Sequence, residues 1–383
     1  MPGPVRSEWP LLVPPAPLLI DPQSPDLQRE LDVLPRRTGI FVLEAAGQDP
    51  YLGWSAYLQK RLRRLLLQTD AGRLEPLTKL RRSVDSVAFW PTQSRLETWL
   101  ILYALARRYN PAEYKQRLKL RSPWFLSLLT ADEFPRLRLA SRIARPPALT
   151  LGPFRTRDLA EAFEQATQSL FQLRRCEEKL APHADHPGCI YGEMNFCLRP
   201  CQLAVTPAEY ASETRRVADF LESEGSSLLT PLLSARDRAS EEMDFEQAAR
   251  LHKQIDKVKA VAATRDALVR PVDELNGLAV TRGLGERAIK LWPMIGGYWQ
   301  QPLVFDFSEG LSESKSIDHV LRETLSTHLA DPVLEGNRAE ELGLLSRWYH
   351  SSWRDGAWVP FRDVAKLNYR RLVKEISLLL KPA

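Results

Sequence analysis

Hydrophobic and polar positions in the opening part of the chain follow the pattern of two strands and a helix. Residues 39–43 (Gly-Ile-Phe-Val-Leu) are apolar, residues 47–50 (Gly-Gln-Asp-Pro) have the composition of a turn, and residues 51–53 (Tyr-Leu-Gly) return as a short strand. Leucines then recur three or four positions apart from Leu58 to Leu66, with lysines and arginines between them. This is the spacing of an amphipathic helix, so the pattern predicts a strand–turn–strand–helix unit.

A second helix is predicted over about residues 94–109. Ser94 and Glu97 are spaced as in a capping box, in which each side chain accepts a hydrogen bond from the backbone of the other residue. Together with the preceding unit, this helix predicts a small α/β domain over residues 34–115.

Helical spacing recurs in the middle of the chain. A helix is expected over 156–180 with Thr156 as its cap. Helical pattern runs again from residue 207 to about 268, with a break near Gly225. The segment between these helices is punctuated by Pro and Gly, which predicts a loop.

The last part of the chain, residues 272–383, contains both apolar strand-like runs and helical spacing of apolar residues. Strands are predicted at 276–282, 287–293 and 302–307, and helices at about 314–329, 338–349 and 361–380. We therefore expect a C-terminal α+β domain, and an α+β multidomain protein as a whole.

Composition places the chain among globular proteins. Of its 383 residues 44% are hydrophobic and 26% are charged, which excludes wholesale disorder and leaves room for several domains. Residues 1–33 are rich in proline and predict an extended, mostly non-globular tail. No run of 18 apolar residues occurs and the start lacks a signal-peptide pattern, so we expect no membrane association and a cytoplasmic protein.

The net charge of +5 is unevenly distributed, because basic residues gather in the first 145 positions. Clustered lysines and arginines can neutralise DNA phosphates. The candidate DNA contacts are Lys60, Arg63, Arg64, Lys119 and Arg121. The alternative is an ordinary solvated helix face.

All four cysteines lie in one short segment. They are Cys176, Cys189, Cys197 and Cys201, spaced Cys-x12-Cys-x7-Cys-x3-Cys. In a reducing compartment, clustered thiols more often hold a metal than form disulfides. Four thiolates can bind one tetrahedral ion or one iron–sulfur cluster. The spacing by itself leaves zinc, a cluster and four buried free thiols open.

The residues around these cysteines carry a family resemblance. Arg174-Arg175-Cys176, Gly188-Cys189 and the run 196–201 (Phe-Cys-Leu-Arg-Pro-Cys) are followed by a helix that opens at Thr206-Pro207. This order resembles the middle segment of UvrC, the incision subunit of bacterial nucleotide excision repair. The resemblance implies that the four cysteines hold a [4Fe-4S] cluster, with zinc as the alternative, within a basic linker and four-Cys segment over 116–215. Gly188 stands where the family usually has proline.

Residues 232–261, within a helical segment over 216–268, contain two apolar stripes separated by a break at Met243-Asp244-Phe245. The break predicts a helical hairpin, and a hairpin this small needs a partner to cover its apolar faces. The alternative is an ordinary helix pair within a larger domain. The string Met-Asp-Phe-Glu-Gln-Ala-Ala-Arg-Leu-His-Lys-Gln-Ile is similar to the UVR motif, by which UvrC docks on UvrB. The resemblance implies UvrB as a partner, and the candidate contacts are Phe245, Ala249, Leu251 and Ile255.

The strand–turn–strand–helix unit carries a third resemblance. Gly39-Ile40-Phe41 and Tyr51-Leu52-Gly53, with Arg61 on the following helix, resemble the GIY-YIG nuclease domain that opens UvrC. Tyr51 and Arg61 are thereby implied as residual catalytic residues. Other positions of the family's active site are substituted, by Phe41, Trp54, Leu65, Leu102 and Tyr114.

The substitution of the metal ligand matters most. Leu102 stands where the family's metal-binding glutamate is expected, and a divalent metal such as Mg needs a carboxylate ligand. A shifted register would recruit Glu97 or Glu113 instead. The resemblance therefore implies a degenerate domain that has lost the family's cutting mechanism.

Three functions remain as hypotheses. The favoured one is a UvrC-like protein of nucleotide excision repair that binds DNA and docks on UvrB without cutting. The second is an active Cho-like structure-specific endonuclease, which would need Mg or another divalent metal. The third is a non-repair binding protein that reuses these modules. Residues 272–383 are too few for the family's second nuclease and helix-hairpin-helix module, so their role stays open.

Overall fold

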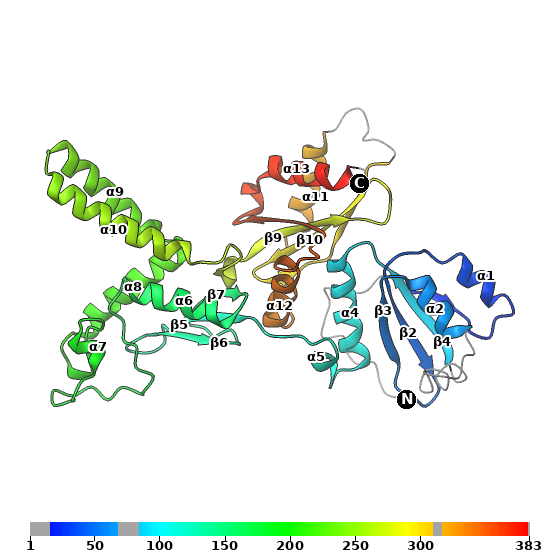
Figure 1. The fold of residues 1–383 in the computed structure, drawn as a ribbon, viewed down its shortest axis with the longest axis horizontal. Helices are drawn as coiled ribbons and strands as arrows, with labels where there is room; N and C mark the ends of the chain where they lie inside the picture. Colours follow the sequence, from blue (N-terminus) through cyan, green and yellow to red (C-terminus); the bar gives the residue numbers. More distant parts are fainter. Residues whose placement is uncertain (1–15, 68–83, 309–315, 382–383) are drawn as a thin grey trace. The chain divides into compact units, whose positions relative to one another are not determined.

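The computed structural model describes residues 16–67, 84–308 and 316–381. The expected α+β multidomain fold is confirmed: helices, hairpins and three antiparallel sheets form two compact units (Figure 1). Unit 1 contains the chain up to Arg121 and from Leu275 onward, and unit 2 contains Ser122–Glu274. Within the described ranges, no helix has the length and apolar character needed to cross a membrane.

The N-terminal part of unit 1 is built on a four-stranded sheet with the order β1-β4-β2-β3. Its strands are β1 (Leu18–Ile20), β2 (Gly39–Ala45), β3 (Tyr51–Ser55) and β4 (Val84–Pro91), and its helices are α1 (Leu27–Asp32), α2 (Leu58–Leu66), α4 (Arg95–Tyr109) and α5 (Tyr114–Arg117). The predicted strands, turn and helices of this region are therefore present, and Ser94 caps α4 by accepting from the backbone N–H of Glu97.

Side chains alternate between the two faces of this sheet, as strand geometry requires. Phe41 and Leu43 pack with Leu58 and Leu62 of α2 in one buried cluster. The opposite face of β2 and β3 contacts α4. Helices on both faces explain why β2 reads as a continuous apolar run.

The expectation of a non-globular tail over 1–33 is wrong for its described part. β1 pairs with β4, and α1 follows it. Ile20 and Leu31 are buried in the same cluster as Phe41. Apolar residues between the prolines therefore anchor this segment to the sheet edge, a long-range pairing that proline content does not reveal.

The C-terminal part of unit 1 is a second sheet with the order β11-β10-β9-β13, to which β12 adds by pairing with β10. Its strands are β9 (Asn276–Arg282), β10 (Ala288–Ile295), β11 (Tyr298–Trp299), β12 (Leu303–Asp306) and β13 (Gly356–Phe361), and its helices are α11 (Ile317–His328), α12 (Arg338–Tyr349) and α13 (Tyr369–Leu380). The helix predicted over 361–380 begins only at Tyr369. Phe361, the first residue of the predicted helix, ends β13, which pairs with β9, and Val364–Lys366 form a short 3-10 turn before α13.

Unit 2 contains the four-Cys segment and the helical hairpin. Its sheet has the order β6-β5-β7-β8. Its strands are β5 (Trp124–Leu128), β6 (Leu137–Ala140), β7 (Leu149–Phe154) and β8 (Arg270–Pro271), and its helices are α6 (Arg157–Gln168), α7 (Ile190–Glu193), α8 (Pro207–Glu222), α9 (Ser226–Glu241) and α10 (Phe245–Ala263), with a short 3-10 helix at Pro200–Gln202.

Two features of unit 2 differ from the sequence prediction. The basic linker contains the three strands β5 to β7, whose buried Phe and Leu residues form a core with α6 and α8. The helix expected over 156–180 is capped by Thr156 as predicted but ends at Gln168. The chain then turns so that Phe171 and Leu173 enter this core instead of continuing a helix face.

The predicted hairpin is present. α9 and α10 lie side by side and antiparallel (Figure 1). The predicted break near Gly225 separates α8 from α9, and Gly225 adopts a φ of 92°, which favours glycine.

Candidate functional site

The motif residues of the first domain lie on both faces of its sheet. Tyr51 and Phe41 share the α2 face, with ring centroids 6.1 Å apart. Gly53 pairs with Phe41, and a Cβ at Gly53 would lie 2.6 Å from the Phe41 ring. The glycine of this motif is therefore required by the close approach of the Phe41 ring.

Arg61 lies half-buried on α2, and Leu65, one turn further on, is buried in the core. In the part of the chain that the structure describes, no carboxylate lies within ion-pair distance of Arg61. Leu102 is buried within α4, on the opposite side of the sheet from α2. The structure therefore does not gather the implied catalytic positions around one carboxylate.

The two carboxylates of the shifted register have structural partners. Glu97 is buried, forms an ion pair with Lys290 of β10, and accepts a hydrogen bond from the Gln93 backbone at 2.9 Å. Glu113 pairs with Arg117 one turn later on the surface.

Tyr114 contacts the C-terminal part of unit 1. Its hydroxyl donates to Glu340 of α12 at 3.0 Å, and burial together with the nearby Glu340 carboxylate raises the pKa of Tyr114. Tyr103 also bonds Glu340, and Lys115 lies 2.7 Å from the same carboxylate. This network joins α4 and α5 to α12.

The candidate DNA contacts differ in exposure. Lys60 and Arg64 are exposed on α2, and Lys119 and Arg121 are exposed beyond α5. Arg63 pairs with Asp32 of α1, so part of its charge is neutralised within the fold.

The four cysteines lie in the irregular segment of unit 2. Cys197 and Cys201 are buried, Cys176 is half-buried and Cys189 is exposed. N–H groups point at two of the sulfur atoms: Arg199 donates from its backbone to Cys197 at 3.4 Å, and the Arg174 guanidinium lies 3.7 Å from Cys176.

The thiols influence one another's ionisation. Burial, with a smaller contribution from the other three cysteines, raises the pKa of Cys197 to about 11. Burial and the neighbouring Cys189 and Cys176 also raise the pKa of Cys201. Neighbouring thiolates repel one another, and a bound metal cation relieves that repulsion. Four thiols are donors of the type that zinc and iron–sulfur clusters take. Among the described residues, however, no three Cys, His, Asp or Glu side chains are arranged as ligands of a single ion.

Gly188, the position where the family has proline, adopts a φ of 76°. Proline is confined to a φ near −65°, so this backbone conformation excludes it. A Cβ here would also lie 2.7 Å from the Gln202 side chain. The loop before Cys189 therefore has its own conformation in this chain.

The hairpin residues fall into two groups. Phe245 is 69% exposed and Met243 is 74% exposed, both at the turn between α9 and α10, and Ala249 is also exposed. Leu251 and Ile255 are buried inside unit 2. Both residues were expected to contact the partner, and their burial corrects this expectation, because a buried side chain offers no surface to a docking protein.

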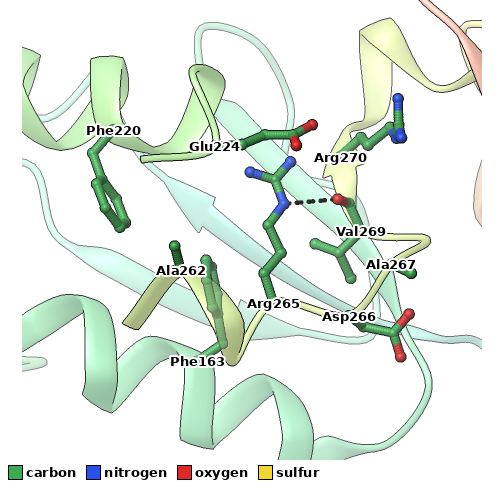
Figure 2. Close-up of a pocket in the computed structure, with 9 residues that line it drawn as sticks. All are labelled: Phe163, Phe220, Glu224, Ala262, Arg265, Asp266, Ala267, Val269 and Arg270. Carbon is green, nitrogen blue, oxygen red and sulfur yellow. Dashed lines mark hydrogen bonds between the residues drawn. The ribbon is translucent and has the colours of Figure 1, made fainter. Parts of the chain in front are cut away.

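A pocket of about 150 Å³ lies at the base of the hairpin (Figure 2). Arg265 lies in its middle and donates to the carbonyl of Leu221 at the end of α8 and to that of Val269, both at 2.8 Å. Glu224 and Arg270 line the same pocket (Figure 2). Arg265 thus clamps the end of α10 to α8 and to the start of β8. No sequence pattern marked this residue, because its role depends on chain segments more than forty positions apart.

Comparison with known families places two matches in unit 2. Residues 124–220 match the model of the UvrC/Cho excinuclease middle domain, and residues 226–261 match the UvrB/uvrC motif. These matches cover the strands β5 to β7, the four-Cys segment and nearly all of the hairpin α9–α10.

Curated relatives match more of the chain. The UvrABC system protein C of Moorella thermoacetica is 26% identical over 92% of this chain and 58% of its own length. The proteins of the same name from Desulfatibacillum aliphaticivorans and Haloarcula marismortui are 25% and 29% identical, over 84% and 67% of this chain and 54% and 44% of their own lengths. The chain thus spans about half the length of the curated relatives it matches. No solved structure matches it significantly. The resemblance to UvrC expected from the cysteine segment and the hairpin is confirmed.

Proposed function

We propose that this protein is a UvrC-like component of nucleotide excision repair that binds DNA and docks on a UvrB-type partner through the hairpin α9–α10. The observation that supports it most directly is the pair of exposed apolar residues, Met243 and Phe245, at the turn of a hairpin that matches the UvrB/uvrC motif. Exposed apolar side chains at such a turn are typical of a protein interface. Leu251 and Ile255 would support the hairpin from inside.

The docking proposal is tested by calorimetry with purified UvrB. Phe245→Ala should weaken binding at least tenfold, since a central aromatic contact contributes about 2 kcal/mol or more. Leu159→Ala is the matched control, because Leu159 is also an exposed apolar residue of unit 2 but lies on α6. Equal affinity of Phe245→Ala and wild type would contradict the proposal.

The first domain is proposed to bind DNA without cutting it by the family mechanism. Supporting this, Leu102 is buried at the position of the metal-binding glutamate, and Glu97 is engaged with Lys290. A nicking assay on damaged duplex with UvrA, UvrB and Mg²⁺ tests it. We expect no incision that depends on Arg61; incision by wild type that is lost in Arg61→Ala would instead favour a Cho-like endonuclease.

A [4Fe-4S] cluster is proposed as the resident cofactor, with Cys176, Cys189, Cys197 and Cys201 as its ligands and zinc as the alternative. Support comes from the number and type of donors and from the mutual effect of the thiols on their pKa values. Bound there, the group would cross-link the loop between α6 and α8. Arg174 would hold that loop as well, through its hydrogen bonds to the carbonyl groups of Phe134 and Glu178 at 2.8 and 2.9 Å.

A further inference from the structure

Trp54 occupies an unusual place for a large aromatic residue. It lies on β3, the edge strand of the first sheet, directly after Gly53, and the residue is 41% exposed. Its ring centroid is 6.5 Å from that of Trp99 on α4, at an angle of 50°. Tyr57, three residues later, is 67% exposed. Aromatic residues thus reach the surface at this edge of unit 1.

Arginines flank the two tryptophans on either side. The guanidinium of Arg95 lies 5.5 Å from the Trp54 ring centroid, and that of Arg347, on α12, lies 3.8 Å from the Trp99 ring centroid. We call Arg95, Trp54, Trp99 and Arg347 the stacking surface. Its members come from a strand and two helices of unit 1 that are far apart in the sequence.

The positive charges of this surface are available for an anion. Within the described ranges, neither Arg95 nor Arg347 forms a salt bridge. The Arg347 guanidinium donates to the carbonyl of Leu118 at 3.2 Å. The nearby Asp355 accepts hydrogen bonds from the backbone N–H of Arg95 and from the Trp348 indole, so its carboxylate is used to join α12 to the start of α4.

The hydrogen bond to Leu118 also connects the stacking surface with candidate phosphate contacts. Lys119 and Arg121, one and three residues after Leu118, are exposed. Alternating cations and exposed aromatic rings are the features by which proteins bind unpaired nucleotides. Bases inside a duplex already stack on their neighbours, so away from the duplex ends only an unpaired base presents a free face to Trp54.

We propose that the stacking surface binds unpaired DNA bases beside a duplex, with a base stacked on Trp54 and the adjoining phosphates bound by Arg95 and Arg347. This inference rests on the proposed DNA binding and specifies its ligand. Trp54 is also one of the substituted positions of the GIY-YIG-like site, so this chain would bind DNA by stacking at a position that the resemblance assigns to the nuclease site.

The test measures fluorescence anisotropy of two labelled DNAs with the full chain: a blunt duplex, and the same duplex with a short single-stranded overhang. Loss of one base–aromatic stack weakens binding about 5- to 150-fold. Trp54→Ala should show such a loss for the overhang DNA and less than about twofold change for the blunt duplex. Trp54→Phe keeps an aromatic face and should retain most of the affinity. Leu159→Ala is the control, because Leu159 is an exposed apolar residue of α6 with no part in either proposed surface, and it should leave both DNAs unaffected.

The outcomes separate the two proposals. If wild type binds neither DNA, the proposed DNA binding fails and the stacking surface fails with it. If wild type binds both DNAs and Trp54→Ala weakens neither, or weakens both equally, the stacking surface alone is overturned. Should Trp54→Ala unfold, the pair Trp54→Phe and Trp54→Leu answers the same question, since both keep bulk and only Phe keeps a π face; equal affinity of that pair for the overhang DNA would also overturn the proposal.

Discussion

Lys290 on β10 forms a buried ion pair with Glu97 on α4, although 193 positions separate the two residues in the chain. Glu97 also accepts from the Gln93 backbone at the start of α4. Glu97, which was a possible metal ligand in the sequence, thus joins the N-terminal and C-terminal parts of unit 1 through its ion pair.

Removing the lysine should destabilise unit 1. Breaking a buried pair leaves an uncompensated charge and costs roughly 3–5 kcal/mol, so Lys290→Met should lower the free energy of unfolding by that amount in a denaturant titration. Arg250→Met is the matched control, because Arg250 pairs with Glu246 on the exposed surface, where a salt bridge contributes at most about 1 kcal/mol. Equal losses of unfolding free energy in the two variants would mean that the buried Lys290–Glu97 pair stabilises the fold no more than an exposed salt bridge.

The two groups of hairpin residues should respond differently to truncation. Ile255 is fully buried, so Ile255→Ala should destabilise unit 2 by about 2–5 kcal/mol, the usual cost of emptying a core position. Phe245→Ala should leave the unfolding free energy within about 0.5 kcal/mol of wild type, since its ring is exposed. Urea unfolding followed by circular dichroism measures both. A large destabilisation by Phe245→Ala would show that this ring supports the fold.

Glu341 on α12 should make stability depend on pH. Burial raises the pKa of Glu341 to about 8 from 4.5, and the neighbouring Glu340 adds to the shift, whereas the Trp299 backbone and Arg107 oppose it. Between these two values the folded state holds a proton that the unfolded state has lost. Stability should therefore fall as pH rises from about 4.5 to 8 and level off above, by up to about 5 kcal/mol in total.

Glu341→Gln should flatten this pH dependence, because glutamine has no proton to lose. Glu246→Gln is the control, as Glu246 is an exposed carboxylate of α10. Thermal unfolding at a series of pH values measures the effect. If the pH dependence of stability were unchanged in Glu341→Gln, titratable groups other than Glu341 would be its cause.

Anaerobic purification should yield protein with iron and acid-labile sulfide in equal amounts, about four of each per chain for a cubane cluster. Cys201→Ser should abolish both, since every thiolate ligand is needed to close the cluster. His183→Asn and His186→Asn, in the same loop, should leave the iron content unchanged. If the protein instead contained one equivalent of zinc and no sulfide, the result would contradict the cluster and favour zinc, the alternative metal.

Local features were predictable from sequence because they depend on neighbours a few residues away. The caps at Ser94 and Thr156, the break at Gly225 and the hairpin turn before Phe245 all follow from short-range hydrogen bonding and periodicity. The strands of residues 124–154 and β13 were missed. These strands pair only with strands from distant segments of the chain, so no local spacing of apolar residues identifies them.

The sequence by itself determined two features on which the proposed function rests: the four clustered cysteines and the hairpin motif. Both are recognised as residue types at fixed spacings. Only the tertiary structure decided which of those residues are accessible. Ile255 is buried where Phe245 is exposed, and Trp54, a lost catalytic position in the sequence, lies at the surface between arginines. The physical reason is that spacing is a property of one segment, whereas exposure and charge pairing are set by whichever other segment packs against it.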